Sequence, residues 1–276
     1  MDNLNLVSVI IPCYNSANYI QETLTSVREQ SYSNVEIIVV DDGSLDNLPD
    51  IMEKEMQKDS RVSFFRQSNK GQSMARQLGV EKSKGKYLLF LDSDDKIHHS
   101  YIQKAVEILD KNPEVGIVTC KAHFFDKMDG EWELPEYVLA DFLIQNSIFI
   151  TSLIRKEDFQ EIGGFDSSLT FYEDWDIFLS LIERGKTVCR IPEVLFYYRK
   201  RENETSVTDN ALKDRYILSY NKKKIYCKHY QLYEKNGLGI DVLFNNKVES
   251  DKYKRKYYSV WYRYIFYRIF NPKKLL

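Results

Sequence analysis

Short apolar runs alternate with stretches of helical spacing along the first 120 residues of this 276-residue chain. The runs are short and rich in β-branched residues, which is typical of strands buried on both faces of a sheet. Four such strands are expected, at Leu6–Pro12, Val35–Val40, Val62–Arg66 and Tyr87–Leu91. A predicted helix follows each of the first three, at Asn18–Gln30, Asn47–Lys58 and Gly71–Lys82. This alternation predicts an α/β fold with a mostly parallel, doubly wound sheet flanked by helices.

The fourth predicted strand runs directly into a cluster of acids. Its apolar residues end at Leu91, and Asp92, Asp94 and Asp95 follow with one serine between them. Ligands of open α/β sheets bind outside the carboxyl ends of the strands, so these carboxylates stand where a ligand is expected. Adjacent acids at a buried strand end repel one another, and the cluster therefore predicts a bound cation.

The pattern becomes irregular after about residue 120, beyond a further strand at Val115–Cys120. The strands expected there are Ile148–Leu153, Thr187–Ile191 and Val194–Tyr198, and the helices are Lys156–Ile162 and Glu173–Arg184. No internal repeat is present. We therefore expect one domain over residues 1–210 and a C-terminal extension over residues 211–276.

Charge is distributed unevenly along the chain. Residues 213–276 hold 16 Lys and Arg against 5 Asp and Glu, a net charge of +11, whereas the whole chain carries −2. Residues 1–212 therefore carry −13. Eleven of the 20 tyrosines also lie in the last quarter, so the extension is basic and aromatic while the rest is acidic.

The extension predicts a helix with one basic and one aromatic face. Lys252, Lys256 and Arg263 share a helical face, and Tyr257, Trp261, Tyr264 and Ile265 fill much of another. Such a helix can lie on an anionic membrane surface through residues 213–276. Docking to another subunit and packing on the core are the alternatives. No nucleic-acid partner is expected, because the rest of the chain is acidic.

Two absences bear on the expected compartment. The sequence has no run of eighteen or more apolar residues, and its first five residues lack the basic and apolar blocks of a signal peptide. The four cysteines form no CxxC pair, which fits a reducing compartment. We expect a cytoplasmic protein, with peripheral attachment to the inner face of the plasma membrane if the extension binds lipid.

Three predicted strand ends bring chemically distinct side chains to one edge of the sheet. They are Pro12–Asn15, Asp41–Ser44 and Asp92–Asp95. An aromatic ring, a hydrogen-bonding carboxylate and a carboxylate pair can hold a base, a ribose and a diphosphate, and Asp-x-Asp is suited to Mg²⁺ or Mn²⁺. The glycine-rich phosphate loops of dinucleotide-binding and P-loop proteins are missing. Arg76, after Asn69-Lys-Gly71, is the best-placed cation to meet phosphate or a nearby backbone carbonyl.

The order and spacing of these motifs resemble family 2 glycosyltransferases. The residues that carry the resemblance are Val7–Asn15, Val39–Ser44 with Asp46, Asn69–Gly71 with Ala75-Arg76, and Gly85–Asp95. It continues through Gly163–Asp166 and Tyr172–Asp176 to Tyr198-Arg199, and so covers roughly residues 6–206. The resemblance implies a GT-A fold, with a nucleotide-binding half at about 1–120 and an acceptor half at about 121–210.

The resemblance also implies roles for individual residues. Pro12 and Tyr14 match residues that flank the base, and Asp42 matches the carboxylate that reads it. Asp92 and Asp94 match the acids that hold ribose and a divalent metal, Mn²⁺ or Mg²⁺. The rest of the implied donor-binding set is Asn15, Asn69, Gly71, Arg76, Ser93 and Arg199.

Asp174 matches the general base of the family, with Glu173 as its catalytic neighbour. An inverting transfer is a direct displacement at the anomeric carbon and needs one base together with one electrophile at the leaving diphosphate. Asp176 is a third candidate for the base, and all three acids could instead stabilise the start of a helix. The family commonly places a His after its Tyr-Arg pair, where this chain has Lys200, Arg201 and Glu202. Lys200 or Arg201 can neutralise the diphosphate there.

The expected activity is therefore the transfer of a hexose or N-acetylhexosamine from a nucleotide-diphosphate sugar. A UDP-sugar is the first candidate for the donor. The acceptor would be a hydroxyl of a glycan or lipid-linked oligosaccharide, as in a bacterial capsule or O-antigen. Two other classes of protein are the alternatives. A sugar nucleotidyltransferase would need a glycine-rich, lysine-bearing loop after the first strand, and an inactive binding scaffold would have lost acids that this chain keeps.

Overall fold

A computed structural model describes residues 5–201, 214–257 and 268 of the chain. It divides into two compact units, residues 1–225 and residues 226–276. Each unit is described by itself. The expectations for Trp261, Arg263, Tyr264 and Ile265 fall outside the described residues, as does Glu202.

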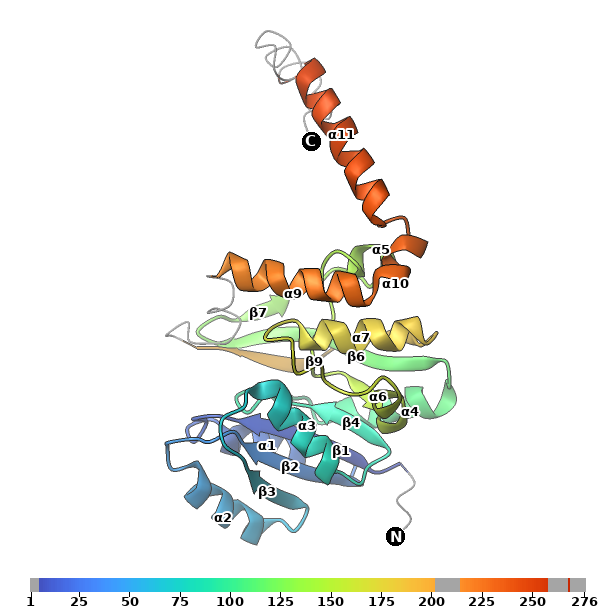
Figure 1. Cartoon of the computed structure of the whole chain (residues 1–276). Coiled ribbons are helices and arrows are strands. Elements are labelled where there is room, and N and C mark those ends of the chain that lie inside the picture. The colour runs from blue at the N-terminus through green and yellow to red at the C-terminus, as the bar shows by residue number, and fades with distance from the viewer. Residues whose placement is uncertain (1–4, 202–213, 258–267, 269–276) are drawn as a thin grey trace. The chain divides into compact units, whose positions relative to one another are not determined.

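The first four strands form the parallel part of one sheet, as the sequence predicts (Figure 1). They are β1 (Val7–Cys13), β2 (Val35–Asp41), β3 (Val62–Arg66) and β4 (Tyr87–Phe90), in the spatial order β3-β2-β1-β4. The connecting helices are α1 (Ile20–Arg28), α2 (Leu48–Lys58) and α3 (Gln72–Lys82). Cys13 pairs with Asp41 in register, so the polar residues after β1 and β2 emerge at the same edge.

Beyond β4 the sheet becomes mixed. Strand β8 (Leu153–Arg155) pairs antiparallel with β4 and with β6 (Val115–Asp126), and β6 then pairs in parallel with β9 (Thr187–Lys200). The short strands β5 (Lys96–Ile97) and β7 (Gly130–Trp132) add antiparallel pairs at β9 and β6. This arrangement confirms the expected α/β class.

Two predicted strand boundaries in this region are wrong. Residues 148–152 lie outside any strand, and β8 begins only at Leu153. The two strands expected at 187–198 are one continuous strand, β9, with a register shift where Cys120 pairs with Ile191 and Lys121 with Val194. Pro192 lies in this bulge and has no N–H to donate to the ladder, so the strand bends there without ending.

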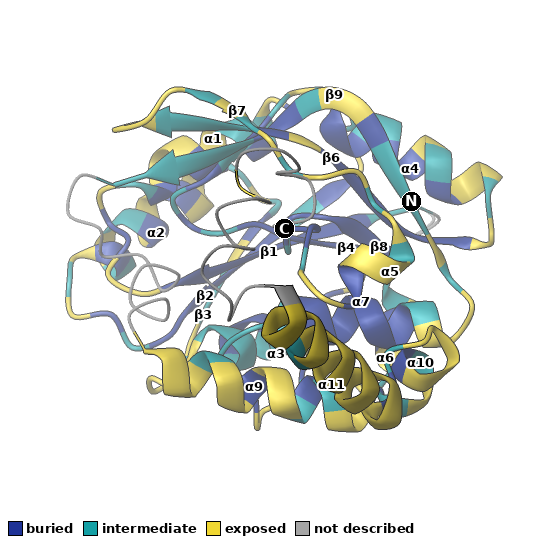
Figure 2. Ribbon diagram, turned by 90° about the horizontal axis from the view of Figure 1, so that it is seen from above, coloured by how far each residue is buried: buried dark blue, intermediate teal, exposed yellow. Residues whose placement is uncertain are grey.

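Helices cover both faces of the sheet. Helix α4 (Tyr101–Lys111), which the sequence analysis did not assign, lies with α1 on one face, while α3 and α7 (Glu173–Glu183) lie on the other (Figure 2). The short helices α5 (Leu139–Phe142) and α6 (Lys156–Glu161) precede and follow β8 in the chain. The central strands are almost wholly buried, with each residue of β1 and β4 buried, whereas β3 and most of β9 are partly exposed. This core makes the strand ends rigid supports for a site.

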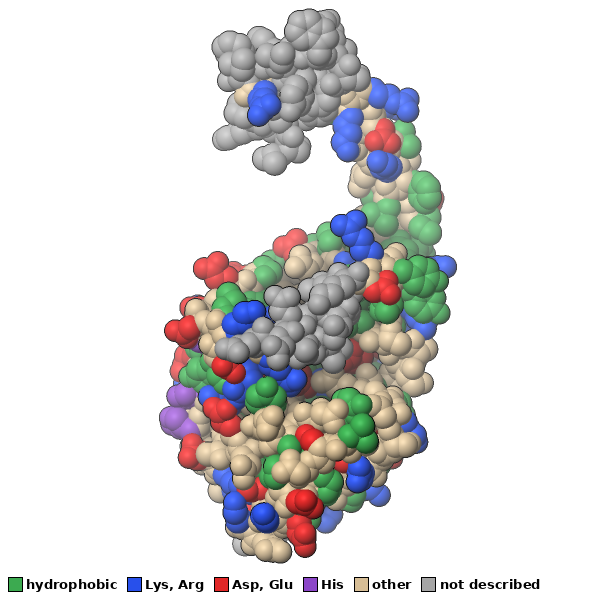
Figure 3. All heavy atoms as spheres, turned by 90° about the vertical axis from the view of Figure 1, so that its left-hand side faces the viewer, with side chains coloured by type: hydrophobic (Ala, Val, Ile, Leu, Met, Phe, Trp, Pro, Cys, Tyr) green, Lys and Arg blue, Asp and Glu red, His purple; other side chains and the backbone are tan. Residues whose placement is uncertain are grey.

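Three helices follow the described sheet domain. They are α9 (Arg215–Lys228), α10 (Tyr230–Lys235) and α11 (Ile240–Tyr257). Within the first unit, the buried amide of Asn221 on α9 donates to Thr170 Oγ1 at 3.1 Å. Apolar and basic side chains lie exposed along α11 in the second unit (Figure 3). No helix among the described residues is long and apolar enough to cross a membrane.

Candidate active site

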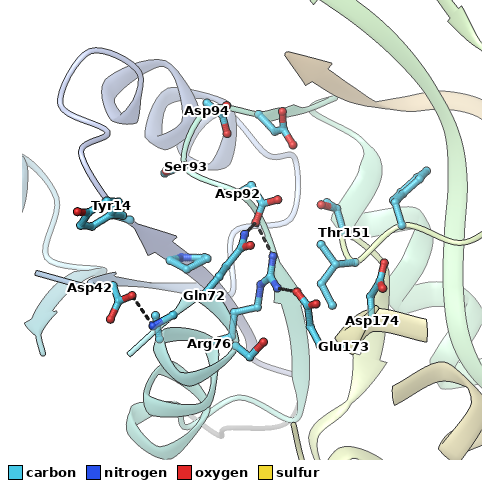
Figure 4. A pocket seen from close by; sticks show the side chains of 18 of the residues that line it. Tyr14, Asp42, Gln72, Arg76, Asp92, Ser93, Asp94, Thr151, Glu173 and Asp174 are labelled. Carbon is cyan, nitrogen blue, oxygen red and sulfur yellow. Dashed lines mark hydrogen bonds and ion pairs between the residues drawn. The ribbon is translucent and has the colours of Figure 1, made fainter. Parts of the chain in front are cut away.

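A cavity of about 1020 Å³ opens at the carboxyl ends of β1, β2 and β4 and reaches the start of α7 (Figure 4). It brings together most of the residues that the sequence predicts for the site. Those that line it are Pro12, Tyr14, Asn15, Asp42, Asn69, Gly71, Arg76, Asp92, Ser93, Asp94, Glu173 and Asp174. Arg199 is not among the lining residues. The cavity has the size usual for a site that encloses a small ligand.

The turn after β1 presents an aromatic ring to this cavity. Pro12 is buried in the strand, whereas Tyr14 is 49 % exposed. Asn15 has a positive φ of 51°, and its backbone N–H donates to Ser44 Oγ at 2.9 Å. Its side-chain oxygen accepts from Leu45 N at 2.9 Å. The ends of β1 and β2 are thereby tied together, which holds the Tyr14 turn in place without covering its ring.

Asp42, at the end of β2, organises the loop that precedes α3. Its Oδ1 accepts hydrogen bonds from Gln67 Nε2 and Lys70 N, each at 2.8 Å, and its Oδ2 accepts one from Gly71 N at 2.8 Å. Gly71 has a φ of 91°, in the region that favours glycine. The sequence analysis missed Gln67, which no motif marks, and gave no role to Lys70 within the Asn69–Gly71 motif. Asp42 thus fixes the Asn69–Gly71 loop at the cavity edge.

Arg76 joins the two halves of the site. Its side chain is only 2 % exposed, with Nη2 at 2.7 Å from Asp92 Oδ1 and Nη1 at 2.8 Å from Glu173 Oε1 (Figure 4). Although burial by itself lowers the pKa of Arg76, the two carboxylates raise it. Gln72 Nε2 donates to the same Asp92 oxygen at 2.7 Å. The guanidinium therefore meets carboxylates, where the sequence analysis expected phosphate or a backbone carbonyl.

The acids after Asp92 have different partners. Arg201 donates to Asp94 Oδ2 from Nε at 2.8 Å and lies with Nη2 at 2.6 Å from it. Burial raises the pKa of Asp94; Arg201 lowers it and the charge of Asp92 raises it further. Asp95 is buried and its Oδ1 accepts the backbone N–H of Arg199 at 2.8 Å. Burial, with the charges of Asp94 and Asp92, raises the pKa of Asp95 well above its usual value.

Ser93 and Arg199 support this segment from outside the carboxylate pair. The Ser93 hydroxyl is buried, 2.6 Å from Ser16 Oγ. The Arg199 guanidinium donates to the backbone oxygen of Asp94 at 2.8 Å and also binds Glu22 and Asp126. These contacts give Arg199 a structural task at the Asp92–Asp95 turn.

The carboxylates of Asp92 and Asp94 fit a divalent cation. Both line the cavity, and carboxylate oxygens are the ligands that Mg²⁺ and Mn²⁺ prefer. Nearby, Asp95 Oδ2 is buried without a hydrogen-bond partner. The described residues contain no group of three or more His, Cys, Asp or Glu side chains arranged around one metal position. Two carboxylates suffice for a cation that takes its remaining ligands from water and phosphate.

Asp174 is the best-placed base among the three acids that open α7. Asp176 is buried and does not line the cavity, and Glu173 is bound to Arg76. Asp174 accepts hydrogen bonds from Trp175 N at 2.7 Å and from Asn146 Nδ2 at 3.0 Å. Burial raises its pKa to about 7, with a further contribution from the negative charge of Glu173. A carboxylate of this pKa exchanges protons effectively near neutral pH.

Asn146 is a site residue that the sequence analysis missed. It lies in the irregular segment between α5 and β8, and its Oδ1 accepts the backbone N–H of Ile148 at 3.0 Å. That bond orients the amide so that Nδ2 faces Asp174. No local pattern marks Asn146, because its partner is 28 residues away.

An aromatic wall lines part of the cavity, and the sequence analysis missed it as well. Its members are Phe124, Trp132, Phe149, Phe196 and Tyr198. Trp132 stacks on Phe124 with ring centroids 5.1 Å apart, and Phe149 lies 4.6 Å from Phe196. Lys200 Nζ lies 5.6 Å from the Phe124 ring centroid and 5.1 Å from that of Tyr198.

Comparison with known proteins matches this region to one family. The family model described as glycosyl transferase family 2 matches residues 8–174. An uncharacterized glycosyltransferase of Rickettsia typhi is 34% identical over 220 residues, covering 75% of this chain and 67% of the relative. The minor teichoic acid biosynthesis protein GgaA of Bacillus subtilis is 28% identical over 221 residues, covering 75% of this chain and 50% of the relative.

Solved structures share the fold at lower identity. TarS residues 1–349 of S. aureus in complex with UDP-GlcNAc superposes with a TM-score of 0.63 at 23% identity, covering 71% of this chain and 59% of that one. The mannosyltransferase PcManGT of Pyrobaculum calidifontis, in complex with GDP-Man and Mn²⁺, gives 0.59 at 18% identity, covering 87% and 74%. The chain thus spans less than two thirds of the TarS structure, and the likeness confirms the expected GT-A fold. Because the family model covers more than half of its residues, the chain belongs to glycosyl transferase family 2.

Proposed function

We propose that this protein transfers a sugar from a UDP-sugar to a hydroxyl of a glycan or lipid-linked acceptor, with inversion and with a divalent metal. One observation carries the proposal: a carboxyl with a pKa of about 7, Asp174, lines the same cavity as the carboxylate pair of Asp92 and Asp94. A displacement with inversion needs a base on the acceptor side and a cation at the leaving group. The cavity holds side chains suited to both tasks.

Asp174 would remove the proton of the acceptor hydroxyl as that oxygen attacks the anomeric carbon. One Asp174 oxygen accepts from Trp175 N and the other from Asn146, which holds the carboxylate in one orientation. Glu173 is bound to Arg76 and so keeps its position beside the base. A raised pKa favours this proton transfer, because a carboxyl whose pKa lies near the working pH is both substantially ionised and basic enough to accept the proton.

The donor would bind across the strand ends. Tyr14 offers a ring for the base, next to the Asp42-organised loop that includes Asn69 and Gly71. Asp92 and Asp94 would hold the ribose and the metal. When bound, the metal would neutralise charge on the leaving diphosphate. We assign Pro12, Asn15, Ser93, Arg76 and Arg199 to support of this donor site. Arg76 would act through Asp92, and Arg199 through the backbone oxygen of Asp94.

The donor and the biological setting rest on relatives. The TarS structure holds UDP-GlcNAc and the PcManGT structure holds Mn²⁺, which supports a UDP-sugar and Mn²⁺ or Mg²⁺ here. GgaA is named for minor teichoic acid biosynthesis, which supports a cell-surface polysaccharide such as a capsule or O-antigen as the product. A screen of sugar nucleotides for hydrolysis with Mn²⁺ and with Mg²⁺ would identify the donor.

Two variants test the assignment of base and metal. Asp94→Ala should abolish the Mn²⁺ dependence of UDP binding in calorimetry, whereas Asp174→Asn should bind UDP normally but lose transfer by a factor of about 10² to 10⁴. Unchanged metal-dependent UDP affinity in Asp94→Ala would move the metal elsewhere. Turnover at the wild-type rate in Asp174→Asn would remove Asp174 as the base.

Residues 213–276 support a second part of the proposal, attachment to the cytoplasmic face of an anionic membrane. On α11, Leu243, Phe244 and Val248 are 43 %, 68 % and 50 % exposed. The last turn of α11 carries Lys254, Arg255 and Lys256. Apolar side chains beside cations favour the lipid–water interface. The full chain should sediment with vesicles rich in phosphatidylserine and not with neutral ones; equal retention after deletion of residues 250–276 would disprove this role.

A further inference from the structure

The end of β9 places a second cation at the carboxylate pair. Arg199 and Arg201 point to one face of the strand, toward the Asp92–Asp95 turn, while Lys200 points to the other, over Phe124. The Arg201 guanidinium contacts Asp94 Oδ2 through Nε at 2.8 Å and Nη2 at 2.6 Å. Among the described residues it also contacts the ring of Tyr19, whose centroid lies 4.7 Å from Cζ. A carboxylate on one side and a ring on the other hold the guanidinium in place.

This contact occupies an oxygen that a metal would use. The side chains of Asp94 and Arg201 are only 17 % and 25 % exposed, so the ion pair is largely removed from water and weakly screened. Two Arg201 nitrogens contact Asp94 Oδ2, so its lone pairs are taken, and the positive charge beside the carboxylate opposes the approach of a divalent cation. At Asp92, Oδ1 already accepts from Arg76 and Gln72, whereas Arg201 contacts Asp94 in this cluster.

We propose that Arg201 is a built-in counter-cation of the metal site: it occupies Asp94 in the donor-free enzyme and moves to the diphosphate when metal and nucleotide bind together. The inference rests on the assignment of Asp92 and Asp94 to the metal in the proposed function. Metal alone would then compete with a tethered guanidinium and bind weakly. When metal and nucleotide bind together, the nucleotide brings phosphate oxygens, and the planar guanidinium of arginine can donate two parallel hydrogen bonds to a pair of them.

The negative charges of the Asp92–Asp95 turn explain why a counter-cation is useful there. Asp92, Asp94 and Asp95 lie within four residues of the chain, and Asp95 is buried. Like charges so close destabilise the fold unless a cation is present. Arg201 supplies that cation before the donor arrives and releases the carboxylate afterwards. The site would therefore take up the metal chiefly as its complex with the nucleotide.

Titration of the full-length protein with Mn²⁺, followed by electron paramagnetic resonance of the free ion, tests the first step without any turnover. Arg201→Gln should bind Mn²⁺ at least about tenfold more tightly than wild type in the absence of nucleotide, because a charge-assisted contact no longer competes. In the presence of Mn²⁺, the same variant should bind UDP about tenfold more weakly in calorimetry, because a phosphate contact is lost.

Lys200→Gln is the matched control. It removes the same charge from the same cavity wall one residue away, but Lys200 lies over the Phe124 and Tyr198 rings rather than at Asp94. Its Mn²⁺ affinity without nucleotide should change by less than about threefold, the effect of a screened charge alone. Adding Asp94→Asn to Arg201→Gln should remove the gain, since a neutral amide then replaces the freed carboxylate.

The proposal predicts two opposite changes in Arg201→Gln: tighter Mn²⁺ binding without nucleotide, and weaker UDP binding in the presence of Mn²⁺. Mn²⁺ affinity equal to wild type in Arg201→Gln, or a gain no larger than that of Lys200→Gln, overturns it, as does unchanged UDP affinity. If Arg201→Gln does not fold, Arg201→Lys keeps the charge without the fork and should give an intermediate Mn²⁺ affinity. If the Arg201→Gln titrations fail but the wild type still shows metal-dependent transfer, only the role of Arg201 is refuted and the proposed function stands. If Mn²⁺ has no effect on UDP binding by the wild type, the proposed function itself is refuted.

Discussion

The hydrogen bond from Asn146 to Asp174 should set the pH at which the enzyme works. As the proposed base, Asp174 would have to be ionised to accept a proton, so kcat should fall as the pH drops through its pKa of about 7. Asn146 Nδ2 lies 3.0 Å from Asp174 Oδ2 and favours the ionised form. Removing this donor in Asn146→Ala should therefore raise the pKa and move the acidic limb of the profile to higher pH.

The size of the shift follows from the single bond that is lost. A hydrogen bond to a charged group contributes about 1.5–3 kcal/mol, and 1.36 kcal/mol corresponds to one pKa unit. Water entering from the cavity will replace part of the bond, so a shift of about one pH unit is expected. Asn146→Asp, which places a second negative charge in the same position, should shift the limb further in the same direction.

The assay is kcat measured against pH at saturating donor and acceptor. Gln145→Ala is the control, because this neighbouring side chain is exposed and does not line the cavity. Thermal melting of each variant separates a change at the base from a loss of folding. An acidic limb that stays in place in Asn146→Ala, or moves to lower pH, would show that the bond does not tune the catalytic base.

Three further predictions concern a charge beside Asp174, a buried ion-pair partner and the close packing of a glycine. Glu173→Gln removes the negative charge beside Asp174, so the acidic limb of kcat should move to lower pH; a move to higher pH would contradict this electrostatic role. Arg76→Met leaves two acids without their buried partner and should lower the free energy of unfolding in urea by about 3–5 kcal/mol; unchanged stability would count against the bridge. Gly85→Ala would place a Cβ 2.8 Å from a backbone oxygen and should cost about 1–3 kcal/mol, whereas Gly239→Ala, with its nearest contact at 3.4 Å, should change stability little.

Local patterns predicted the N-terminal half of the fold well. Strand β3 was predicted at Val62–Arg66 and is found there, and the boundaries of the other six elements up to β4 differ by at most two residues, whereas β6 runs six residues beyond the predicted Cys120. Helix α4 was missed although its apolar residues recur at 101, 102, 105, 106 and 109, the spacing of a helix with one buried face. In the second half, Ile148–Leu153 was mistaken for a strand because an apolar segment that packs as a buried loop has the same composition.

The sequence by itself determined that the side chains after β1, β2 and β4 would meet, because parallel strands of known order end at one edge of a sheet. Tyr14, Asp42 and Asp92 do line one cavity. Their individual roles in donor binding stay predictions, with the experiments above as their tests.

Only the tertiary structure decided which groups these side chains contact. Arg76 and Glu173 are 97 residues apart, and Asp94 and Arg201 are 107 apart, so no local pattern could pair them. The raised pKa of Asp174 likewise depends on how much protein surrounds its carboxyl. Desolvation and long-range ion pairs arise from packing between distant segments, whereas strands and their ends follow from the order of neighbouring residues.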